Sequence, residues 1–248
     1  MTLVVPGGGG GIGLAAARRM HDEGATIVVG DVDADAGAAA AEELSGLFVP
    51  VDVSDQGAVD ALFATAADRY GSVDIAFNNA GISPPEDDLI EDTELPAWQR
   101  VQDVNLKSVY LCCRAALRHM APAGKGSIIN TASFVAVMGS ATSQISYTAS
   151  KGGVLAMSRE LGVQYARQGI RVNALCPGPV NTPLLQELFA ADPERAARRL
   201  VHVPLGRFAE PEEIAAAVAF LASDDASFIT ASTFLVDGGI SSAYVTPL

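Results

Sequence analysis

The sequence predicts an α/β fold: a doubly wound parallel sheet of about seven strands with helices on both faces. Short apolar runs rich in Val and Ile alternate with helical segments along the whole chain, which is typical of a parallel sheet. The chain has 248 residues, of which 49% are hydrophobic, and this suits one domain with a large core. Only 6% are aromatic, so we expect helices to pack closely on the sheet. We therefore predict a single domain over residues 1–248.

Local signals place the elements in order. Short apolar runs that end at Gly, Pro, Asn or Asp predict strands at residues 2–5, 26–30, 47–51, 73–77, 126–131, 170–176 and 233–236. Helical segments are predicted at residues 14–20, 36–44, 56–70, 96–120, 147–168 and from Glu210, where Pro and acids occupy the first turn.

Two connections are longer than the rest. Residues 82–95 are acidic and contain prolines, which indicates a surface loop. Residues 180–208 form an excursion with an apolar helical stripe: Leu184, Leu185, Leu188 and Phe189. Such insertions often form lids over a site, although a packed surface helix explains the stripe equally well.

Charge and cysteine content exclude several classes of protein. The net charge is −13 with a pI of about 4.5 and no basic stripe, so we expect no nucleic-acid partner. Three cysteines, of which Cys112 and Cys113 are adjacent, make no disulfide framework. Without a signal peptide they indicate a reducing cytoplasm. The longest uncharged run is rich in Ser, Thr and Gly, so we expect no membrane span. We expect no metal site.

A glycine cluster lies between the first strand and the first helix. Strand, glycine turn and helix together present backbone N–H groups and a helix N-terminus to a phosphate, as in Rossmann-type folds. Glycines let the backbone approach a pyrophosphate closely. No Gly-Lys-Ser/Thr follows, which disfavours a nucleoside-triphosphate loop. The candidate residues for this cofactor contact are Gly7, Gly9, Gly11, Ile12 and Gly13.

The ends of the next three strands supply further candidates. Asp31 follows the second strand, about 20 residues beyond the glycine turn, where a carboxylate accepts hydrogen bonds from an adenosine ribose. The alternative is a solvated loop carboxylate. Asp52 and Val53 follow the third strand, where an adenine edge would lie. Asn79-Ala80-Gly81 follows the fourth strand, and these small and amide residues are suited to brace the glycine turn.

Tyr147 and Lys151 are four residues apart on a predicted helix and so share one face. A free tyrosine, with a pKa of about 10, is a poor acid or base at neutral pH. A neighbouring ammonium favours the phenolate and lowers that pKa. Ser133 follows the fifth strand, where its hydroxyl can meet the tyrosine at the crevice of the sheet. Alone, the Tyr–Lys pair also fits an ordinary amphipathic helix.

Taken together, these features resemble the short-chain dehydrogenase/reductase family over essentially the whole chain. The matching stretches are Gly7-x-x-x-Gly11-Ile12-Gly13, Asp52-Val53, Asn79-Ala80-Gly81, Asn105, Ser133, Tyr147-x-x-x-Lys151, and Pro177-Gly178 followed by Thr182. The resemblance implies that Tyr147 is the general acid/base, that Ser133 orients the substrate oxygen and that Lys151 holds the nicotinamide ribose. It also implies that Asn105 supports a water relay to the lysine, and that Val180 and Thr182 contact the nicotinamide.

The resemblance implies a hydride transfer between a nicotinamide dinucleotide and a carbonyl or secondary alcohol. We expect NAD, because Asp31 opposes a 2′-phosphate and no Arg or Lys occurs between Arg19 and Arg69. Arg18 and Arg19 lie further along the first helix, and one of them could still curl back toward a 2′-phosphate. Family members form dimers and tetramers through the predicted helices 96–120 and 147–168 and the tail, so we expect a homotetramer.

Two alternative functions stay open, and the substrate of the expected reaction is open as well. A sugar-nucleotide epimerase or dehydratase shares the Tyr–Lys motif but usually has a larger carboxy-terminal domain, and only a short segment follows Pro177. A non-catalytic dinucleotide-binding protein does not need the full Ser, Tyr, Lys and Asn set. Many members are 3-oxoacyl-carrier-protein reductases, and basic residues are available for an acidic carrier or coenzyme A, although a solvated helix face explains them too: Arg195, Arg198 and Arg199.

One position departs from the family pattern. Pro6 stands before the first glycine, where the family usually has Thr. Proline has neither a hydroxyl nor an N–H group to brace the turn. We therefore expect this substitution to bear on the local geometry and on the cofactor affinity.

Overall fold

We describe the protein from a computed structural model, which covers residues 1–140, 142–182, 185–186, 194 and 200–244. Seven parallel strands in these residues form one sheet in the order β3-β2-β1-β4-β5-β6-β7. The strands are β1 Thr2–Pro6, β2 Thr26–Asp31, β3 Leu47–Pro50, β4 Ile75–Asn78, β5 Gly126–Thr131, β6 Ile170–Pro177 and β7 Thr233–Val236. The predicted doubly wound fold is confirmed.

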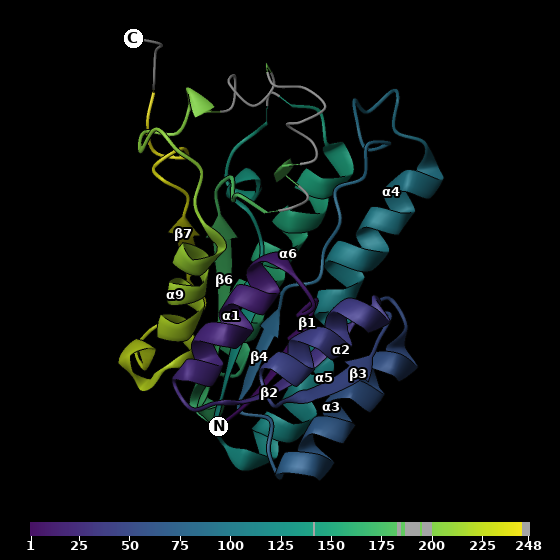
Figure 1. Cartoon of the computed structure of the whole chain (residues 1–248). Coiled ribbons are helices and arrows are strands. Elements are labelled where there is room, and N and C mark those ends of the chain that lie inside the picture. The colour runs from purple at the N-terminus through teal and green to yellow at the C-terminus, as the bar shows by residue number, and fades with distance from the viewer. Residues whose placement is uncertain (141, 183–184, 187–193, 195–199, 245–248) are drawn as a thin grey trace.

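Helices cover both faces of the sheet (Figure 1). One layer contains α1 (Gly11–Asp22), α2 (Ala34–Glu43) and α9 (Pro211–Ala222), and the other contains α3 (Gln56–Tyr70), α5 (Ser108–Ala123) and α6 (Ile145–Gln164). Alternate residues of each strand enter the two cores, as period-2 geometry requires. In β1, Val4 packs toward α3 and α5, whereas Leu3 and Val5 pack toward α1 and α9.

The strand order reverses between β1 and β4, because the chain returns from the edge strand β3 to pair β4 with β1. In open α/β sheets, ligands bind outside the carboxyl ends of the strands at such a switch point. The glycine turn and the segment after β4 both start at this point. The fold therefore brings together the residues that the sequence marks as candidates.

The predicted helix 96–120 is interrupted. It consists of α4 (Leu95–Gln102), a π-helical segment (Asp103–Lys107) and α5. Neither Pro nor Gly marks the interruption, and single π-turns are frequent at functional sites. The extra residue per turn coincides with Asn105, whose fully buried side chain makes tertiary hydrogen bonds, so tertiary contacts outweigh the ideal helix here.

Other boundaries move by a few residues. The predicted strand 73–77 is observed as β4, and the predicted helix 147–168 begins at Ile145 and ends at Gln164, followed by a 3₁₀ turn (Ala166–Gln168). Ser133 lies two residues beyond β5, at the start of a 3₁₀ turn (Phe134–Ala136). Of the apolar stripe in the excursion, Leu184, Leu188 and Phe189 lie outside the described residues, as do Arg195, Arg198 and Arg199.

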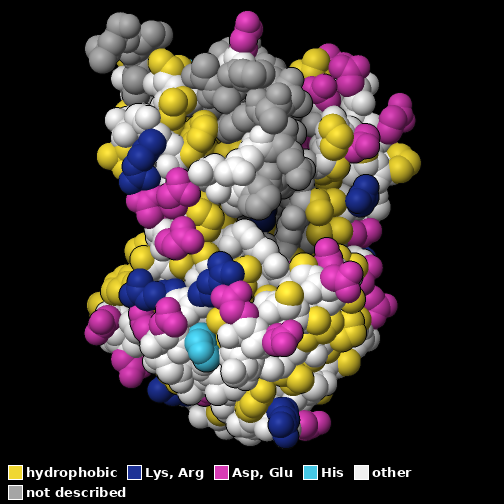
Figure 2. Space-filling model, in the orientation of Figure 1, with side chains coloured by type: hydrophobic (Ala, Val, Ile, Leu, Met, Phe, Trp, Pro, Cys, Tyr) yellow, Lys and Arg dark blue, Asp and Glu magenta, His cyan; other side chains and the backbone are white. Residues whose placement is uncertain are grey.

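The surface reflects the acidic composition. On the face shown in Figure 2, Lys and Arg side chains are scattered among more numerous Asp and Glu side chains and form no continuous stripe. Among the described helices, none has both the length and the apolar character needed to span a bilayer.

Candidate active site

A cavity of about 1970 Å³ opens at the carboxyl ends of the strands. This volume exceeds the roughly 300–1,000 Å³ of ordinary small-molecule pockets, so it has room for a dinucleotide and a substrate together. Most of the predicted site residues line it: Gly7, Gly11, Ile12, Asp31, Asp52, Val53, Asn79, Ala80, Gly81, Ser133, Tyr147, Lys151, Pro177, Gly178, Val180 and Thr182.

Steric contacts dictate the glycine turn. Gly7 has a φ of 77°, and a Cβ there would lie 2.7 Å from the Ala80 Cα. A Cβ on Gly13 would lie 2.0 Å from the Gly7 carbonyl oxygen, because α1 starts directly against β1. A Cβ on Gly9 would lie 2.8 Å from the Asp31 carboxylate. Gly11, with a φ of 51°, lies next to Thr182. Glycine is therefore required by close approach at several points of the turn.

The glycine turn is held by hydrogen bonds that do not need a side-chain hydroxyl at position 6, which Pro6 lacks. The Pro6 carbonyl accepts hydrogen bonds from the N–H groups of Asn79 (3.2 Å) and Ala80 (3.0 Å). The Asn79 amide donates to the Gly7 carbonyl at 3.0 Å, as the sequence predicts. The Gly7 N–H donates to the Gly30 carbonyl at 2.7 Å. Because the brace uses the carbonyl of Pro6 and not its nitrogen, proline is compatible with this turn.

Asp31 is held at the end of β2, facing the cavity. One carboxylate oxygen accepts from the Gly9 N–H at 2.8 Å, and the other accepts from the Asp33 N–H at 3.1 Å. Asp52, at the end of the neighbouring β3, accepts from the Ser54 N–H at 2.9 Å. The carboxylate of Asp31 thus lies beside the glycine turn, which is the arrangement that suits an adenosine ribose.

The cations nearest in sequence to Asp31 are engaged elsewhere. The guanidinium of Arg18 makes two hydrogen bonds to Glu43, at 2.6 and 2.8 Å. Arg19 pairs with Glu23 one turn along the same helix. Neither arginine forms an ion pair with Asp31. In the structure, both guanidinium groups are paired with glutamates that lie outside the glycine turn.

Lys151 is buried beneath Tyr147. Its ammonium donates to the Thr131 carbonyl at 2.7 Å and lies 5.6 Å from the centre of the Tyr147 ring. Burial lowers the pKa of Lys151 from 10.5 to about 8, although Cys176 acts in the opposite direction. At neutral pH the side chain is still mainly charged, and a cation so close to a phenol favours its ionised form.

Ser133 lies on the segment that follows β5 and lines the same cavity as this pair. It is 5% exposed, and its hydroxyl accepts a long hydrogen bond of 3.4 Å from the Val135 N–H. The hydroxyl proton remains available to a group in the cavity, which Ser133 and Tyr147 both line. A hydroxyl and a phenol at one site can stabilise and protonate a developing alkoxide.

Asn105 is fully buried, and its amide is fixed by the main chain of Ile82. The side-chain oxygen accepts from the Ile82 N–H and the amide nitrogen donates to the Ile82 carbonyl, both at 2.8 Å. The amide nitrogen also donates to the Ser150 hydroxyl at 3.2 Å. Asn105 therefore connects the segment after β4 with α6.

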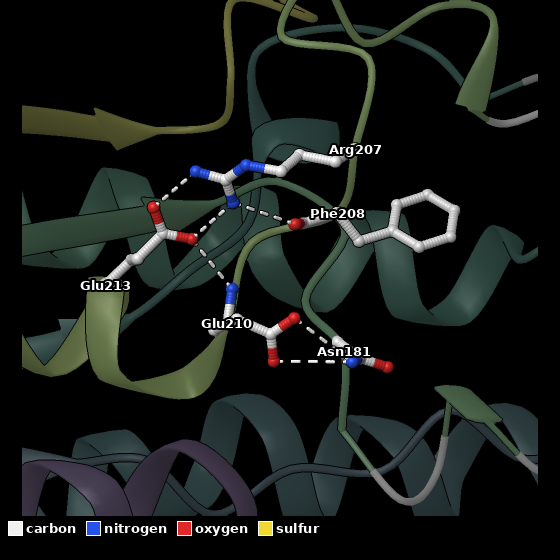
Figure 3. A network of polar contacts seen from close by, with 5 residues as sticks. All are labelled: Asn181, Arg207, Phe208, Glu210 and Glu213. Atoms are coloured by element: carbon white, nitrogen blue, oxygen red, sulfur yellow. Dashed lines mark hydrogen bonds and ion pairs between the residues drawn. The ribbon is translucent and has the colours of Figure 1, made fainter.

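The segment that follows β6 packs against two parts of the chain further along the sequence. Gly178 is packed against Asp237, where a Cβ would lie 2.7 Å from its Cα. Val180 pairs with Ala209, and the Asn181 N–H donates to the Ala209 carbonyl at 2.7 Å. A polar network lies beside this pairing (Figure 3). Arg207 donates to both Glu213 carboxylate oxygens, and the Asn181 amide donates to the Glu210 carboxylate. The pairing with Ala209 fixes Val180, two residues before Thr182, at the cavity wall.

Sequence reasoning missed Asp87, which we expected in a surface loop. Asp87 is only 5% exposed, and its carboxylate accepts hydrogen bonds from the N–H groups of Ser146 and Tyr147. These partners are 59 and 60 residues away in the sequence. No local pattern marks such a contact, because the aspartate stands in an acidic, proline-containing segment like any solvated carboxylate.

The residues fit a nicotinamide dinucleotide. The glycine turn leads directly into α1, the Asp31 carboxylate accepts from the Gly9 N–H beside it, and Thr182 lies against Gly11. Lys151, Tyr147 and Ser133 lie at the other end of the same cavity. Among the described residues, no three His, Cys, Asp or Glu side chains are grouped as metal ligands.

The chain is similar to known dehydrogenases and reductases. The profile of the enoyl-(acyl carrier protein) reductase family matches residues 8–241. The chain is 44% identical to the cis-4-hydroxycyclohexanecarboxylate dehydrogenase of Sinomonas cyclohexanicum, over 96% of this chain and 95% of that protein. It is 39% identical to the 3-oxoacyl-(acyl-carrier-protein) reductase of Chlamydia pneumoniae, over 96% of each. The crystal structure of levodione reductase superposes with a TM-score of 0.92 at 36% identity, over 98% of both chains.

Proposed function

The chain belongs to the short-chain dehydrogenase/reductase family, and within the hydride transfer of that family we propose that Tyr147 is the general acid/base and NAD(H) the cofactor. The chain is an oxidoreductase, as its named relatives are, and the family typically uses a nicotinamide cofactor. The single observation that carries the proposal is the buried Lys151 ammonium 5.6 Å from the Tyr147 ring, in a cavity shared with Ser133.

Each side chain has a proposed part in the reaction. The bound nicotinamide supplies or accepts the hydride. In the reductive direction, Tyr147 donates its proton to the developing alkoxide, and the Ser133 hydroxyl donates a hydrogen bond to the same oxygen. Lys151 stabilises the phenolate that remains. Asn105 holds the segment at Ile82 and supports the proton path toward Lys151.

The test is turnover in Tyr147→Phe. Removal of a general acid/base typically lowers kcat about 10²–10⁴-fold, and we expect this loss with intact folding and cofactor binding. Tyr110→Phe is the matched control, because Tyr110 is half exposed on α5 and does not line the cavity. Near-wild-type kcat in Tyr147→Phe would remove the assignment.

The preference for NAD(H) is proposed from Asp31. A 2′-phosphate at the ribose would bring a charge of nearly −2 beside this carboxylate. Arg18 and Arg19 are engaged with Glu43 and Glu23 and do not neutralise it. We expect kcat/KM for NAD(H) to exceed that for NADP(H) by about tenfold or more, roughly 1.4 kcal/mol. Asp31→Ala should narrow this difference in kcat/KM, chiefly by weakening the binding of NAD(H). A wild-type preference for NADP(H) would contradict the proposal.

The substrate is a small molecule with a carbonyl or secondary alcohol. Two substrates deserve the first assays because of the relatives' names: 4-hydroxycyclohexanecarboxylate and a 3-oxoacyl thioester. The cavity that Tyr147 lines also includes apolar side chains, among them Ile82, Phe134 and Met138, which suit a ring or an acyl chain. A panel of both substrates, in both reaction directions, would separate the two classes.

We also propose a homotetramer. Large apolar side chains are exposed on α6 (Val163, 72%) and beyond α9 (Phe228, 102%), and Leu235 is 41% exposed on the edge strand β7. Isolated exposed apolar residues are ordinary, but these lie on elements at the outside of the sheet, where a second copy can pair symmetrically. Light scattering at micromolar concentration should return the mass of four chains, and a monomer mass would reject the proposal.

A cytoplasmic location is proposed from the cysteines. Cys112, Cys113 and Cys176 are all buried as free thiols. Burial raises the pKa of Cys113 to about 12, which keeps it as an unreactive thiol. Recovery of the protein from a secreted or membrane fraction of its cells would contradict this.

A further inference from the structure

The N-terminus of α6 is capped by a residue from outside the helix. Gln144, at the N-cap position, makes no capping hydrogen bond with its side chain. Instead, one carboxylate oxygen of Asp87 accepts from the Ser146 N–H and the other from the Tyr147 N–H, each at 2.8 Å. The neighbouring Asp88 carbonyl accepts from the Ile145 N–H at 3.3 Å. The loop after β4 thus satisfies the N–H groups that the first turn leaves unpaired.

The same loop is attached to Tyr147 by a second route. The Tyr147 carbonyl accepts from the Ser150 hydroxyl at 2.7 Å, and that hydroxyl accepts from the Asn105 amide at 3.2 Å. Asn105 in turn holds both main-chain groups of Ile82. Ile82 and Asp87 are five residues apart in one loop. Together with the chain from Ile82 to Asp87, the hydrogen bonds therefore form a closed circuit that starts and ends at the backbone of Tyr147.

The charge of Asp87 is directed at these two amides. Among the described residues, Asp87 forms no ion pair with Lys or Arg, and its carboxylate is stabilised by N–H groups at a helix N-terminus. Local capping of α6 needs only a Ser, Thr or Asn at position 144. A carboxylate from a loop 60 residues away does more, because it fixes where the loop and the first turn of α6 lie relative to each other.

We propose that Asp87 is a positioning residue for Tyr147, an inference that rests on the proposed role of Tyr147 as general acid/base. The carboxylate holds the backbone of the first turn of α6, and so sets the place of the phenol beside Lys151, in the cavity that Ser133 also lines. Asp87 takes no part in proton transfer. A displacement of about 1 Å in a reacting group can cost about 10²-fold in rate, so the loss of this contact should appear in kcat.

The experiment compares Asp87→Ala and Asp87→Asn with Asp92→Ala and Asp92→Asn. Asp92 is an exposed carboxylate of the same loop. For each variant, kcat and KM are measured well below its own Tm, and the NADH dissociation constant is measured by fluorescence. We expect Asp87→Ala to lower kcat about 10- to 100-fold with unchanged NADH binding. Asp87→Asn should recover part of the loss, because its amide oxygen still accepts one N–H.

The outcomes separate the possible failures. Wild-type kcat in Asp87→Ala, or equal kcat in Asp87→Ala and Asp87→Asn, overturns the inference. If Asp87→Ala does not fold, the comparison of Asp87→Asn with Asp92→Asn is decisive. A lower kcat in Asp87→Asn than in Asp92→Asn, with unchanged NADH binding, supports the inference, and an equal kcat overturns it. Tyr147→Phe is assayed in parallel. Full turnover in that variant would reject the proposed function itself, whatever Asp87 does.

Discussion

The two ends of the cavity are specified in different ways. At the glycine turn, backbone atoms touch each other, and Gly7 and Gly13 are required because any side chain would collide with main chain. At α6, side chains bind distant backbone groups: Lys151 reaches Thr131 across 20 residues, Asn105 reaches Ile82 across 23, and Asp87 reaches Tyr147 across 60. The first end depends on shape and the second on buried polar groups. Substitutions at the two ends should therefore fail for different reasons.

The largest effect is expected at the shape-dependent end. In Gly13→Ala, the new Cβ would lie 2.0 Å from the Gly7 carbonyl oxygen. No side-chain rotation relieves this contact, because the main chain fixes the positions of both atoms. Overpacking typically costs about 1–3 kcal/mol and occasionally more, so we expect a loss of about 3 kcal/mol or no folded protein. Urea denaturation measures the change.

Gly10→Ala is the control for this prediction. Gly10 belongs to the same turn, but its φ of −163° is open to any residue, and a Cβ there meets no heavy atom within 4 Å. Its free energy of unfolding should stay near wild type. Equal unfolding curves for Gly13→Ala and wild type would show that α1 shifts without cost, and the steric account of this end would fail.

A smaller effect of opposite sign is expected at the polar end. Burial lowers the Lys151 pKa from 10.5 to about 8, so holding the ammonium costs about 3 kcal/mol at neutral pH. The hydrogen bond to the Thr131 carbonyl returns roughly 1.5–3 kcal/mol. Without cofactor, Lys151→Met should therefore match wild type in stability or exceed it by as much as about 2 kcal/mol, while turnover is lost. A clear destabilisation would contradict this.

The pH dependence of that difference has a defined sign. Between pH 8 and 10.5, the unfolded chain keeps the proton on Lys151 and the folded chain releases it. The free energy of unfolding of the wild type should therefore rise with pH in this window relative to Lys151→Met. Urea denaturation of both proteins at pH 7 and pH 10 measures it. A difference that stays constant would show that the lysine is not desolvated in the folded state.

The smallest effect is expected where polar groups are exposed. Arg207 makes hydrogen bonds to both oxygens of Glu213, and these bonds lower the pKa of Glu213 to about 2, with help from the Glu210 N–H. Exposed ion pairs contribute little to stability. Arg207→Ala should therefore leave the Tm close to wild type while the Glu213 pKa rises toward 4.5. An NMR titration detects the rise, and a large drop in Tm would show that this network supports the fold.

The difference between the two ends of the cavity also explains which features the sequence could predict. The sheet, the glycine turn and the Tyr147–Lys151 pair follow from local spacing, because the turn contacts and the helix face are set by neighbours along the chain. The π-turn at Asn105 and the burial of Asp87 depend on contacts with distant segments, and neither leaves a local pattern. The sequence indicates that Pro6 bears on the local geometry of the turn, because proline lacks a hydroxyl and an N–H group. The structure shows a brace through its carbonyl, which any residue supplies.

The circuit through Ile82 and Asp87 divides the loop for protein engineering. Ile82 is gripped by its main chain and Asp87 by its carboxylate, whereas Ser83, Pro84 and Pro85 between them line the cavity. A library that randomises residues 83–86 and keeps Ile82 and Asp87 would reshape one wall of the cavity while the attachment to Tyr147 stays in place. Substitutions in this loop could therefore change the substrate scope while the proposed catalytic residues Tyr147 and Lys151 stay unchanged.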